Sequence, residues 1–524
     1  MKRELINVVA ILGFVLLGAA VILGILTGIL FIFPKASIMG ARAVKERDTQ
    51  IVYQDATLAD AFANGKFILE SLGTHIEVKM SSEGYEGDGT IVVNESATGI
   101  SFNNLNRTLI EWTQTLYGDN NDLYYRIKVL EPSGMVFSDK PTTVYINLPH
   151  RTYDFKYDFV LQNKYSPVNF SFVNDTETNT DKILIHNLII EDAASVNVPY
   201  VVGNTVDNIT VNANRTKLVC SAEVKNNVFV HGAYNDLNFG SESTGIVGNV
   251  VIDGDHNSFN GTSADKVTFK ANHGKLNMSK TIDSLEVVTT QADISVNEVS
   301  GAVTMDTVTG NLSVNSVGGG LIFNAGTDAE PYATANVNVN NNVSGASKIK
   351  NYGIGNINMH GVNGVVDILS KEVGAGNVNV DFAAGASGYK VDILTYDANV
   401  SVGGINGGNI TLEVLGGHDR AGYANIKTQF NKVGTVNIVS GGYVSGHDDI
   451  GNVEVSLDDH CNNVDLYVFN AGFANCADKY GIDKLKVSND KTNSASAKNL
   501  IIFDDCSTEG TGSIIIDSRR VILA

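Results

Sequence analysis

A five-residue signature recurs along the second half of the chain and constrains its fold more than any other feature. A small residue is followed by four residues in which the third and fifth positions are apolar, as in Ala292–Val296, Gly301–Met305 and Gly310–Val314. Further copies begin at Gly248, Gly274, Ala335, Gly355, Gly364, Gly376, Ala398, Gly408, Gly434, Gly451 and Gly512. Their spacings cluster near 9–12 and 16–26 residues, which indicates about two short strands in each coil of a repeat.

The physics of a strand explains the signature. Two apolar residues two positions apart point to the same face of a strand. A third apolar residue follows three positions later, at Val299, Val308 and Val317, and we expect it to turn inward after a corner. One coil has too little apolar surface to fold alone, so coils must stack, with the polar residues facing water or forming rows. The sequence therefore predicts an all-β fold built around a parallel β-solenoid, a β-helix or β-roll.

Composition agrees with a repeat array and excludes one class of partner. The chain has 524 residues, more than the usual size of one compact domain, and contains 52 glycines. Its formal net charge of −20 repels nucleic acid, and no cluster of Lys and Arg offsets it. We interpret the acidity as a source of solubility or, alternatively, as a means of binding divalent cations.

The N-terminus predicts one transmembrane helix. Residues 5–33 are almost all apolar, with Asn7 and Thr27 as interruptions. Such a helix would be about 43 Å long, enough to cross a hydrocarbon core of about 30 Å. We expect residues 1–4 to form a cytoplasmic stub, and the chain to be a single-pass cell-membrane protein whose large C-terminal part is extracellular.

Three further segments follow the predicted span. Residues 34–66 are expected to form a juxtamembrane connector, with a short helix capped by Asp55 or Thr57. Residues 67–165 are expected to form a small β module, with a hairpin around "GDNN" and with Trp112 in its core. Residues 166–524 are expected to form the β-solenoid repeat domain.

The repeats resemble a known family. The stretch "GAVTMDTVTGNLSVNSVGG", residues 301–319, is similar to an adhesin family of bacterial envelope proteins, a domain of unknown function with a β-roll or β-solenoid fold. The resemblance is clear over residues 240–460 and extends more loosely over 130–524. It implies a solenoid that follows a single membrane segment, and it supplies no catalytic residues.

Three polar turns are candidates for the chemistry of a polysaccharide lyase or hydrolase, which needs clustered carboxylates in a groove. They are Asp253, Asp255 and His256; His418, Asp419 and Arg420; and His447, Asp448 and Asp449. All three lie in stretches rich in Gly and Asn, where turns place polar residues in any case. We therefore expect no catalytic residue and no organic cofactor.

Calcium is the one cofactor that the sequence leaves open. Asp253, Asp255 and Asn257 alternate like the oxygen ligands of a hard-cation loop, although the full twelve-residue pattern is absent. The cysteines suggest no zinc site, because none has the required spacing. They are Cys220, Cys461, Cys476 and Cys506. Cys461 and Cys476 could be bridged, either could pair with Cys506, or all four could be buried thiols.

The sequence thus favours a membrane-anchored, adhesin-like or structural envelope protein of a bacterium. We expect a stiff acidic rod that presents its surface to a glycan or a protein ligand, or that serves as a scaffold with no ligand. One alternative is an enzyme that acts on envelope polysaccharide. Another is a cytoplasmic, membrane-bound scaffold that polymerises end to end, as bactofilin-like proteins do.

Overall fold

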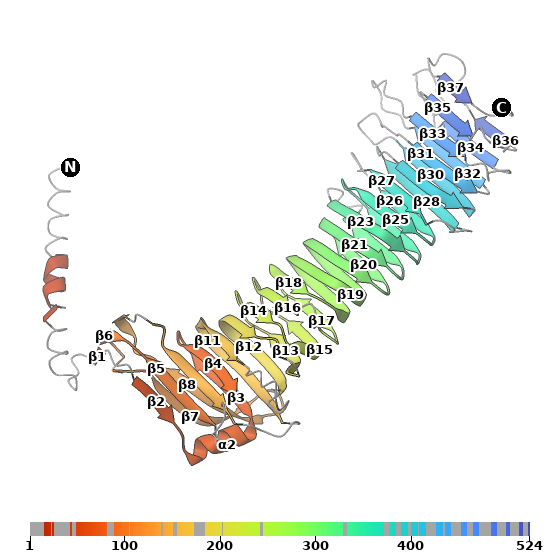
Figure 1. Cartoon of the computed structure of the whole chain (residues 1–524). Coiled ribbons are helices and arrows are strands. Elements are labelled where there is room, and N and C mark those ends of the chain that lie inside the picture. Colours follow the sequence, from red (N-terminus) through yellow and green to blue (C-terminus); the bar gives the residue numbers. More distant parts are fainter. Residues whose placement is uncertain are drawn as a thin grey trace, which may run out of the picture. The chain divides into compact units, whose positions relative to one another are not determined.

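The structure is a computed structural model in which the chain is mostly β-strand (Figure 1). It describes residues 15–22, 24–25, 42–44, 49–80, 89–103, 105–137, 140–149, 155–171, 184–201, 203–240, 245–327, 333–370 and 377–383, and then the strands of residues 389–523. The all-β prediction is confirmed, and parallel pairing dominates.

The chain divides into two compact units, unit 1 (Met1–Thr244) and unit 2 (Gly245–Ala524). This division differs from the predicted boundary at 165/166, because one strand, Lys156–Ser171, runs through that position. The predicted span at 5–33 lies mostly outside the described residues, of which 15–22 are helical. Among the residues described, no helix is both long enough and apolar enough to span a bilayer.

From residue 42 onward, the described residues of unit 1 form one short helix and sixteen strands. They are β1 (Arg42–Val44), β2 (Thr49–Tyr53), α2 (Ala56–Asn64), β3 (Lys66–Ser71), β4 (His75–Met80), β5 (Thr90–Glu95), β6 (Thr98–Ser101), β7 (Leu109–Tyr117), β8 (Asp122–Leu130), β9 (Gly134–Phe137), β10 (Thr143–Leu148), β11 (Lys156–Ser171), β12 (Leu184–Val198), β13 (Thr205–Val211), β14 (Lys217–Cys220), β15 (Glu223–Val230) and β16 (Asp236–Phe239). Strands β1, β6 and β9 form a separate antiparallel sheet.

Two ladders of strands make up most of unit 1. In the first, β8, β3, β11, β12 and β13 pair in parallel, and β7 is antiparallel to β8 at the edge. In the second, β10, β4, β11, β12 and β14 pair in parallel, with β5 and β2 added antiparallel. The long strands β11 and β12 take part in both ladders, so the regular parallel pairing begins before the predicted start at residue 166.

Apolar side chains fill the interior of unit 1. One face of β10 points into this interior, since Val144, Ile146 and Leu148 are all fully buried. Phe67 stacks against Phe159 with 5.7 Å between the ring centroids, and both side chains are inaccessible to solvent. Large aromatic side chains of this kind contribute much of the apolar area that is buried on folding.

The short helix predicted within residues 34–66, with Asp55 or Thr57 as its cap, is present as α2. Its N-cap is Asp55, whose side chain accepts a hydrogen bond from the Leu58 backbone N–H, and Gly65 ends it in the left-handed region at φ 74°. The predicted connector is nevertheless structured beyond this helix. It contains β2, which pairs with β5, because the alternating stretch Thr49–Tyr53 completes the edge of the second ladder.

The predicted hairpin is confirmed in β7 and β8, which pair in antiparallel register from Leu109↔Leu130 to Tyr117↔Asp122. The prediction that Trp112 lies in the core is only partly right, since the side chain is half-buried. It makes an edge-on contact with Tyr53 on β2, with ring centroids 5.8 Å apart. Trp112 therefore covers the end of the core, where the edge strands of the two ladders meet.

Unit 2 consists of strands throughout its described residues. They are β17 (Val250–Asp253), β18 (Asn257–Gly261), β19 (Ala264–Val299), β20 (Val303–Thr307), β21 (Thr309–Val317), β22 (Leu321–Ala325), β23 (Thr334–Val343), β24 (Ser347–Asn351), β25 (Ile357–Val362), β26 (Val366–Ser370), β27 (Val378–Phe382), β28 (Tyr389–Tyr396), β29 (Val400–Asn406), β30 (Gly408–Leu415), β31 (Ile426–Lys432), β32 (Thr435–Gly441), β33 (Asn452–Leu457), β34 (Asp465–Asn470), β35 (Lys484–Asn489), β36 (Asn499–Phe503), β37 (Ser513–Ile516) and β38 (Ile522–Leu523).

Each strand of unit 2 from β20 onward pairs in parallel with the strand two places along the chain, which gives two ladders (Figure 1). One ladder runs through residues 285–288 of β19 and then β20, β22, β24, β26 and β28. The other runs through residues 291–299 of β19 and then β21, β23, β25, β27 and β29. Two strands per repeat is the number that the signature predicts.

The signature residues take the places predicted for them. The apolar pair Leu312 and Val314 is fully buried, as is the later Val317. Val308 differs, because it is only half-buried at the turn between β20 and β21. The apolar pair of the signature is therefore buried, while the polar positions beside it, such as Asn311 and Ser313, are at least partly exposed.

Candidate functional site

The predicted cluster in "IDGDHN" lies in the turn between β17 and β18. Asp255 accepts hydrogen bonds from the backbone N–H of Asn272, at 2.6 Å, and from its side-chain Nδ2, at 3.1 Å. These hydrogen bonds hold the pKa of Asp255 below its ordinary value. The His256 ring stacks on His273 of the next coil, with centroids 4.6 Å apart. Asp255 and His256 thus each contact the residue 17 positions later, in the neighbouring strand region of β19.

The three predicted calcium ligands do not share one surface. Asp253 is exposed at the end of β17, whereas Asn257 is buried and donates its side-chain N–H to the Gly254 carbonyl oxygen at 2.8 Å. In the part of the chain that the structure describes, no group of three His, Cys, Asp or Glu side chains could hold a metal ion.

The other two predicted clusters lie outside the described residues. They are His418, Asp419 and Arg420, and His447, Asp448 and Asp449. Three of the four cysteines, Cys461, Cys476 and Cys506, also fall there. Cys220 is described, and it is a free, fully buried thiol.

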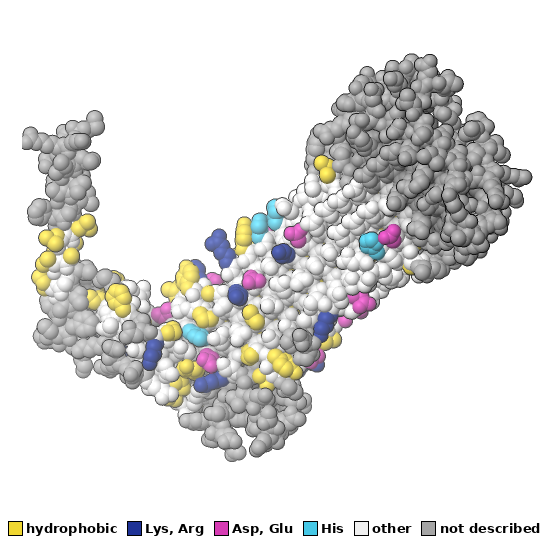
Figure 2. Space-filling model, turned by 45° about the horizontal axis from the view of Figure 1, so that its top comes forward, with side chains coloured by type: hydrophobic (Ala, Val, Ile, Leu, Met, Phe, Trp, Pro, Cys, Tyr) yellow, Lys and Arg dark blue, Asp and Glu magenta, His cyan; other side chains and the backbone are white. Residues whose placement is uncertain are grey.

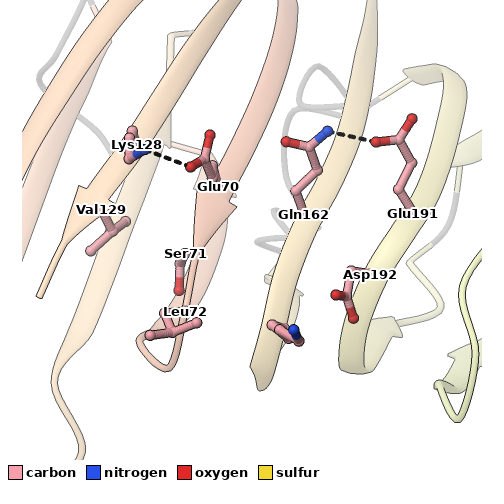
Figure 3. Close-up of a pocket in the computed structure, with 9 residues that line it drawn as sticks. Glu70, Ser71, Leu72, Lys128, Val129, Gln162, Glu191 and Asp192 are labelled. Atoms are coloured by element: carbon pink, nitrogen blue, oxygen red, sulfur yellow. Dashed lines mark hydrogen bonds and ion pairs between the residues drawn. The ribbon is translucent and has the colours of Figure 1, made fainter.

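Unit 1 carries a groove of about 570 Å³ on its first ladder (Figure 3). Residues from β3, β8, β11 and β12 line it: Glu70, Ser71, Leu72, Lys128, Val129, Gln162, Lys164, Glu191 and Asp192. The outward side chains of four neighbouring parallel strands form its floor, with Glu70 directly opposite Lys128 on β8 and Gln162 on β11. The groove is therefore a product of strand register, which brings together residues far apart in the sequence.

Hydrogen bonds and ion pairs already engage two carboxylates of this groove. Lys128 lies 2.8 Å and Arg126 2.9 Å from the Glu70 carboxylate. Burial alone raises the pKa of Glu70, but these two cations outweigh it, and the net pKa lies below the ordinary value. The groove thus holds Glu70 as an ionised partner of two cations.

Glu191, on the opposite side of the groove, is held by neutral donors. The Tyr117 hydroxyl and the Gln162 side-chain N–H both donate to its carboxylate. Burial and the adjacent Glu191 carboxylate raise the pKa of the Tyr117 hydroxyl, so this group remains a proton donor at neutral pH. Glu70 and Glu191 both already bind side chains of the protein. The groove is therefore a polar surface suited to hydrogen bonding.

Unit 2 presents a different kind of surface on the ladder that contains β21, β23, β25 and β27. Two neighbouring rows of its outward side chains make up what we call the amide face. The same ladder also exposes Glu298, His360 and Asp381 beside these rows, and His360 lies 2.7 Å from the Asp381 carboxylate. The first row consists of Asp293, Asn311, Asn336, Asn356 and Asn377. The second row consists of Ser295, Ser313, Asn338, Asn358, Asn379 and Ser401.

Hydrogen bonds join successive asparagines in both rows. In the first row, Asn311 donates through Nδ2 to Asp293 at 2.8 Å, and Asn336 donates to Asn311 at 2.7 Å. In the second row, Asn358 donates to Asn338 at 2.8 Å, and Asn379 donates to Asn358 at 2.7 Å. The predicted polar rows are therefore present as hydrogen-bonded ladders of amides.

An aspartate is the first member of several such rows of side chains. The first side chain has to accept a hydrogen bond from the next asparagine but has no earlier member to which it must donate one. Asp293 does so for Asn311, Asp306 for Asn324 at 2.6 Å, and Asp255 for Asn272. Unit 1 has the same arrangement, where Asn187 donates to Asp158 at 3.0 Å and in turn accepts from Asn208. A carboxylate accepting from an amide is a charge-assisted hydrogen bond, which is stronger than one between neutral groups.

The other ladder of unit 2 has a charged outer face. Its aligned outward residues include Glu286, Thr304, Ile322, Lys348 and Asp367 in one row. The amide face, by contrast, has Asp293 as the single ionisable side chain in its two described rows. Figure 2 shows a broad area of uncharged polar surface in which charged side chains are sparse.

Sequence reasoning found the amide rows but missed the groove. The rows follow from the repeat, since the same polar position recurs in each copy of the signature. The groove falls where the sequence shows no repeat. The signal that could have found it was the alternation of charged with apolar residues in "FILES" and "YRIKVL", which places Glu70, Arg126 and Lys128 on outward faces.

Comparison of the chain with protein-family models, with curated proteins and with solved structures gave no match. The resemblance of the repeats to an adhesin family of bacterial envelope proteins therefore remains a prediction. The function must be argued from the surfaces described above.

Proposed function

We propose that this chain is a membrane-anchored cell-surface protein with an adhesive or structural role, in which a parallel β-solenoid presents a rigid acidic surface to a partner. The observation that carries the proposal is the parallel pairing of each strand from β20 onward with the strand two places along the chain. This pairing sets equivalent signature positions opposite one another, as in Ser295↔Ser313↔Asn338.

The solenoid follows if each pair of successive strands forms one coil. Strands β22 and β23 would then make one coil and β24 and β25 the next, with Phe323, Val337 and Val339 pointing into a shared interior. A coil of this type contacts only its neighbours, so its surface repeats with the strand spacing of about 4.8 Å. A solenoid of this kind would present long rows of equivalent outward side chains, and such rows suit adhesion or scaffolding.

The anchor and its orientation are also part of the proposal. Residues 5–33 are apolar enough to cross a bilayer, with Lys2 and Arg3 on the short side. We propose that residues 1–4 stay in the cytoplasm and that the β-rich part lies outside the cell.

A whole-coil deletion tests the solenoid. Removing residues 356–376 takes out β25 and β26 together, and would let β27 stack on β23 and β28 stack on β24. We expect this variant to fold, with a circular-dichroism spectrum and a cooperative melt like those of the full chain. Removing residues 356–365 takes out half of a coil and should prevent folding. Equal damage by both deletions would contradict the solenoid.

Protease access tests the location. We expect proteinase K added to intact cells to digest the β-rich part and remove a C-terminal tag. Protection until the cells are permeabilised would instead support a cytoplasmic scaffold. The same digestion with calcium or with chelator present tests whether calcium stabilises the fold. Slower digestion in calcium would support the predicted cation site at Asp253 and Asp255.

An enzyme that acts on envelope polysaccharide is supported less well. The groove of unit 1 has carboxylates, but Glu70 is paired with Lys128 and Arg126, and Glu191 is held by Tyr117 and Gln162. A polymerising scaffold also has a feature against it. The ladders of unit 1 end at β7 and β2, which are antiparallel to their neighbours and so interrupt the parallel pattern that a second copy would continue.

A further inference from the structure

We propose that the amide face of unit 2 is a docking surface for an uncharged, linear polysaccharide that lies along the rows, an inference that rests on the proposed surface function. The amide face is the set of outward side chains in the two rows from Asp293 to Asn377 and from Ser295 to Ser401.

Charge is the first step of the argument. The chain carries a formal net charge of −20, yet the described part of the amide face contains one ionisable side chain, Asp293, at its first coil. The opposite ladder carries Glu286, Asp306, Lys348, Lys350 and Asp367 on its outer face. Beside the rows, His360 and Asp381 bind each other at 2.7 Å, and Glu298 lies at the first coil. A neutral partner therefore matches the two rows, because beyond Asp293 they offer no charge with which a charged partner could pair.

Hydrogen-bonding capacity is the second step. An amide side chain has two N–H donors and two acceptor lone pairs on its oxygen. In the second row, Asn358 uses one N–H toward Asn338 and one lone pair toward Asn379. The remaining donor and acceptor of Asn358 are available to a partner. Hydroxyl groups of a sugar satisfy both kinds of site, since each can donate and accept.

Periodicity is the third step. The two rows repeat with the spacing of parallel strands, about 4.8 Å, so a polymer laid along them meets the same groups at each coil. The described members of the rows include no aromatic side chain, so the contacts would be polar and individually weak. Once one sugar unit is bound, the next units of the same chain are held close to the following coils, so their weak contacts strengthen the binding of the whole polymer. The affinity should therefore rise steeply with the length of the sugar chain, and short oligosaccharides should bind poorly.

The experiment measures co-sedimentation of the full-length protein, in detergent, with insoluble cellulose and with chitin. Polygalacturonate and chitosan serve as charged polymers, and soluble oligosaccharides of increasing length compete. We expect binding to at least one uncharged polymer, weak competition by disaccharides and strong competition by long oligomers. Failure to bind any uncharged polymer would overturn the inference.

Two substitutions locate the binding surface. Asn338→Asp keeps the oxygen that accepts from Asn358, and Ser313→Asp places a carboxylate next to Asn338, as Asp293 lies next to Asn311. Each adds one negative charge to the second row and leaves the hydrogen bonds between its asparagines in place. Each should weaken binding about tenfold, because the sugar would have to desolvate that charge. Ile322→Asp is the matched control, since it adds the same charge to the outer face of β22, beside Lys348.

The outcomes separate the inference from the function on which it rests. Binding that is unchanged by Asn338→Asp and Ser313→Asp, or reduced equally by Ile322→Asp, would place the sugar elsewhere and refute the amide face. Circular dichroism and thermal melts of each variant show whether a loss reflects unfolding. If proteases reach the β-rich part on intact cells but no uncharged polymer binds, the docking surface fails while the proposed surface location stands. If they do not reach it, the surface location fails, and the sedimentation result still decides the chemistry of the amide face.

Discussion

Gly310 lies directly against the backbone of Ala292 in the preceding coil. A Cβ atom added to Gly310 would come within 2.0 Å of the Ala292 carbonyl oxygen, and the backbone of Gly310 is in the left-handed region at φ 123°. Gly355 has the same relation to Ala335, with the added Cβ 1.8 Å from its carbonyl oxygen. At Gly310 and Gly355 the first position of the signature is therefore a glycine, because the backbone of the paired strand lies too close for a side chain.

Gly310→Ala should destabilise unit 2 strongly. Both the close approach and the positive φ oppose a side chain, so we expect a loss of at least about 1–3 kcal/mol in the free energy of unfolding. Hydrogen exchange of β21 and β23, measured by mass spectrometry on the full chain, should show faster opening. Gly118→Ala is a control for the positive φ alone, since a Cβ there meets nothing within 4 Å. An effect of Gly310→Ala no larger than that of Gly118→Ala would show that the close approach is relieved at little cost.

Asn358→Ala should cost about 1–2 kcal/mol, because it removes one hydrogen bond on each side of the second row. The protection of amides in β25 and β27 against exchange should fall. Asn340→Ala, which truncates an exposed asparagine of β23, is the matched control and should change stability by less than about 0.5 kcal/mol. Equal effects of the two substitutions would mean that the amide row adds nothing to stability.

Asp207 should make the stability of unit 1 depend on pH in the acid range. Burial alone raises the pKa of Asp207, but hydrogen bonds from Lys156 and His186 outweigh it, and the net pKa is lowered. A carboxyl with a lowered folded pKa adds stability that is fully present above its unfolded pKa, about 3.9, and is lost as the pH falls through the folded pKa.

Asp207→Asn should therefore cost about 1–3 kcal/mol at neutral pH and flatten the acid limb of the stability curve. Urea unfolding of both proteins between neutral pH and about pH 2, followed by Trp112 fluorescence, measures the difference. The two curves should converge at the lowest pH. A constant gap between them over the whole range would show that the ionised carboxylate is not the source of the stability.

Cys220 should be unreactive in the folded protein. Burial raises the pKa of its thiol to about 12, so at neutral pH almost no thiolate is present and reagents cannot reach the sulfur. In a variant with serine at the other three cysteine positions, iodoacetamide should label Cys220 only after denaturant is added. Rapid labelling of the native protein would indicate that β14 opens readily.

The sequence predicts the repeating part of this protein well because its rules are local. An apolar residue at every second position fixes which side of a strand faces inward, and Leu312 and Val314 obey that rule. The helix at Ala56–Asn64 was predictable for the same reason, since the Asp55 cap and the Gly65 stop lie within one short segment.

The groove and the ends of the ladders could not be predicted in this way. Glu70, Lys128 and Gln162 meet only because β3, β8 and β11 lie side by side, and no local pattern specifies that order of strands. Trp112 is a similar case, since its contact with Tyr53 depends on where the two ladders end. The partners of His256 and Asp255 likewise depend on the register between coils.

The first amide row shows how tolerant this architecture is of changes in length. Asn311 and Asn336 are 25 residues apart and Asn336 and Asn356 are 20 apart, yet both pairs are joined by a hydrogen bond between successive coils. The number of intervening residues changes, but β23 still pairs in parallel with β21 and with β25. Insertions between the strands can therefore arise and be selected without disturbing the rows of side chains on the strands. The connecting segments can diversify in evolution while the spacing of the strands stays the same.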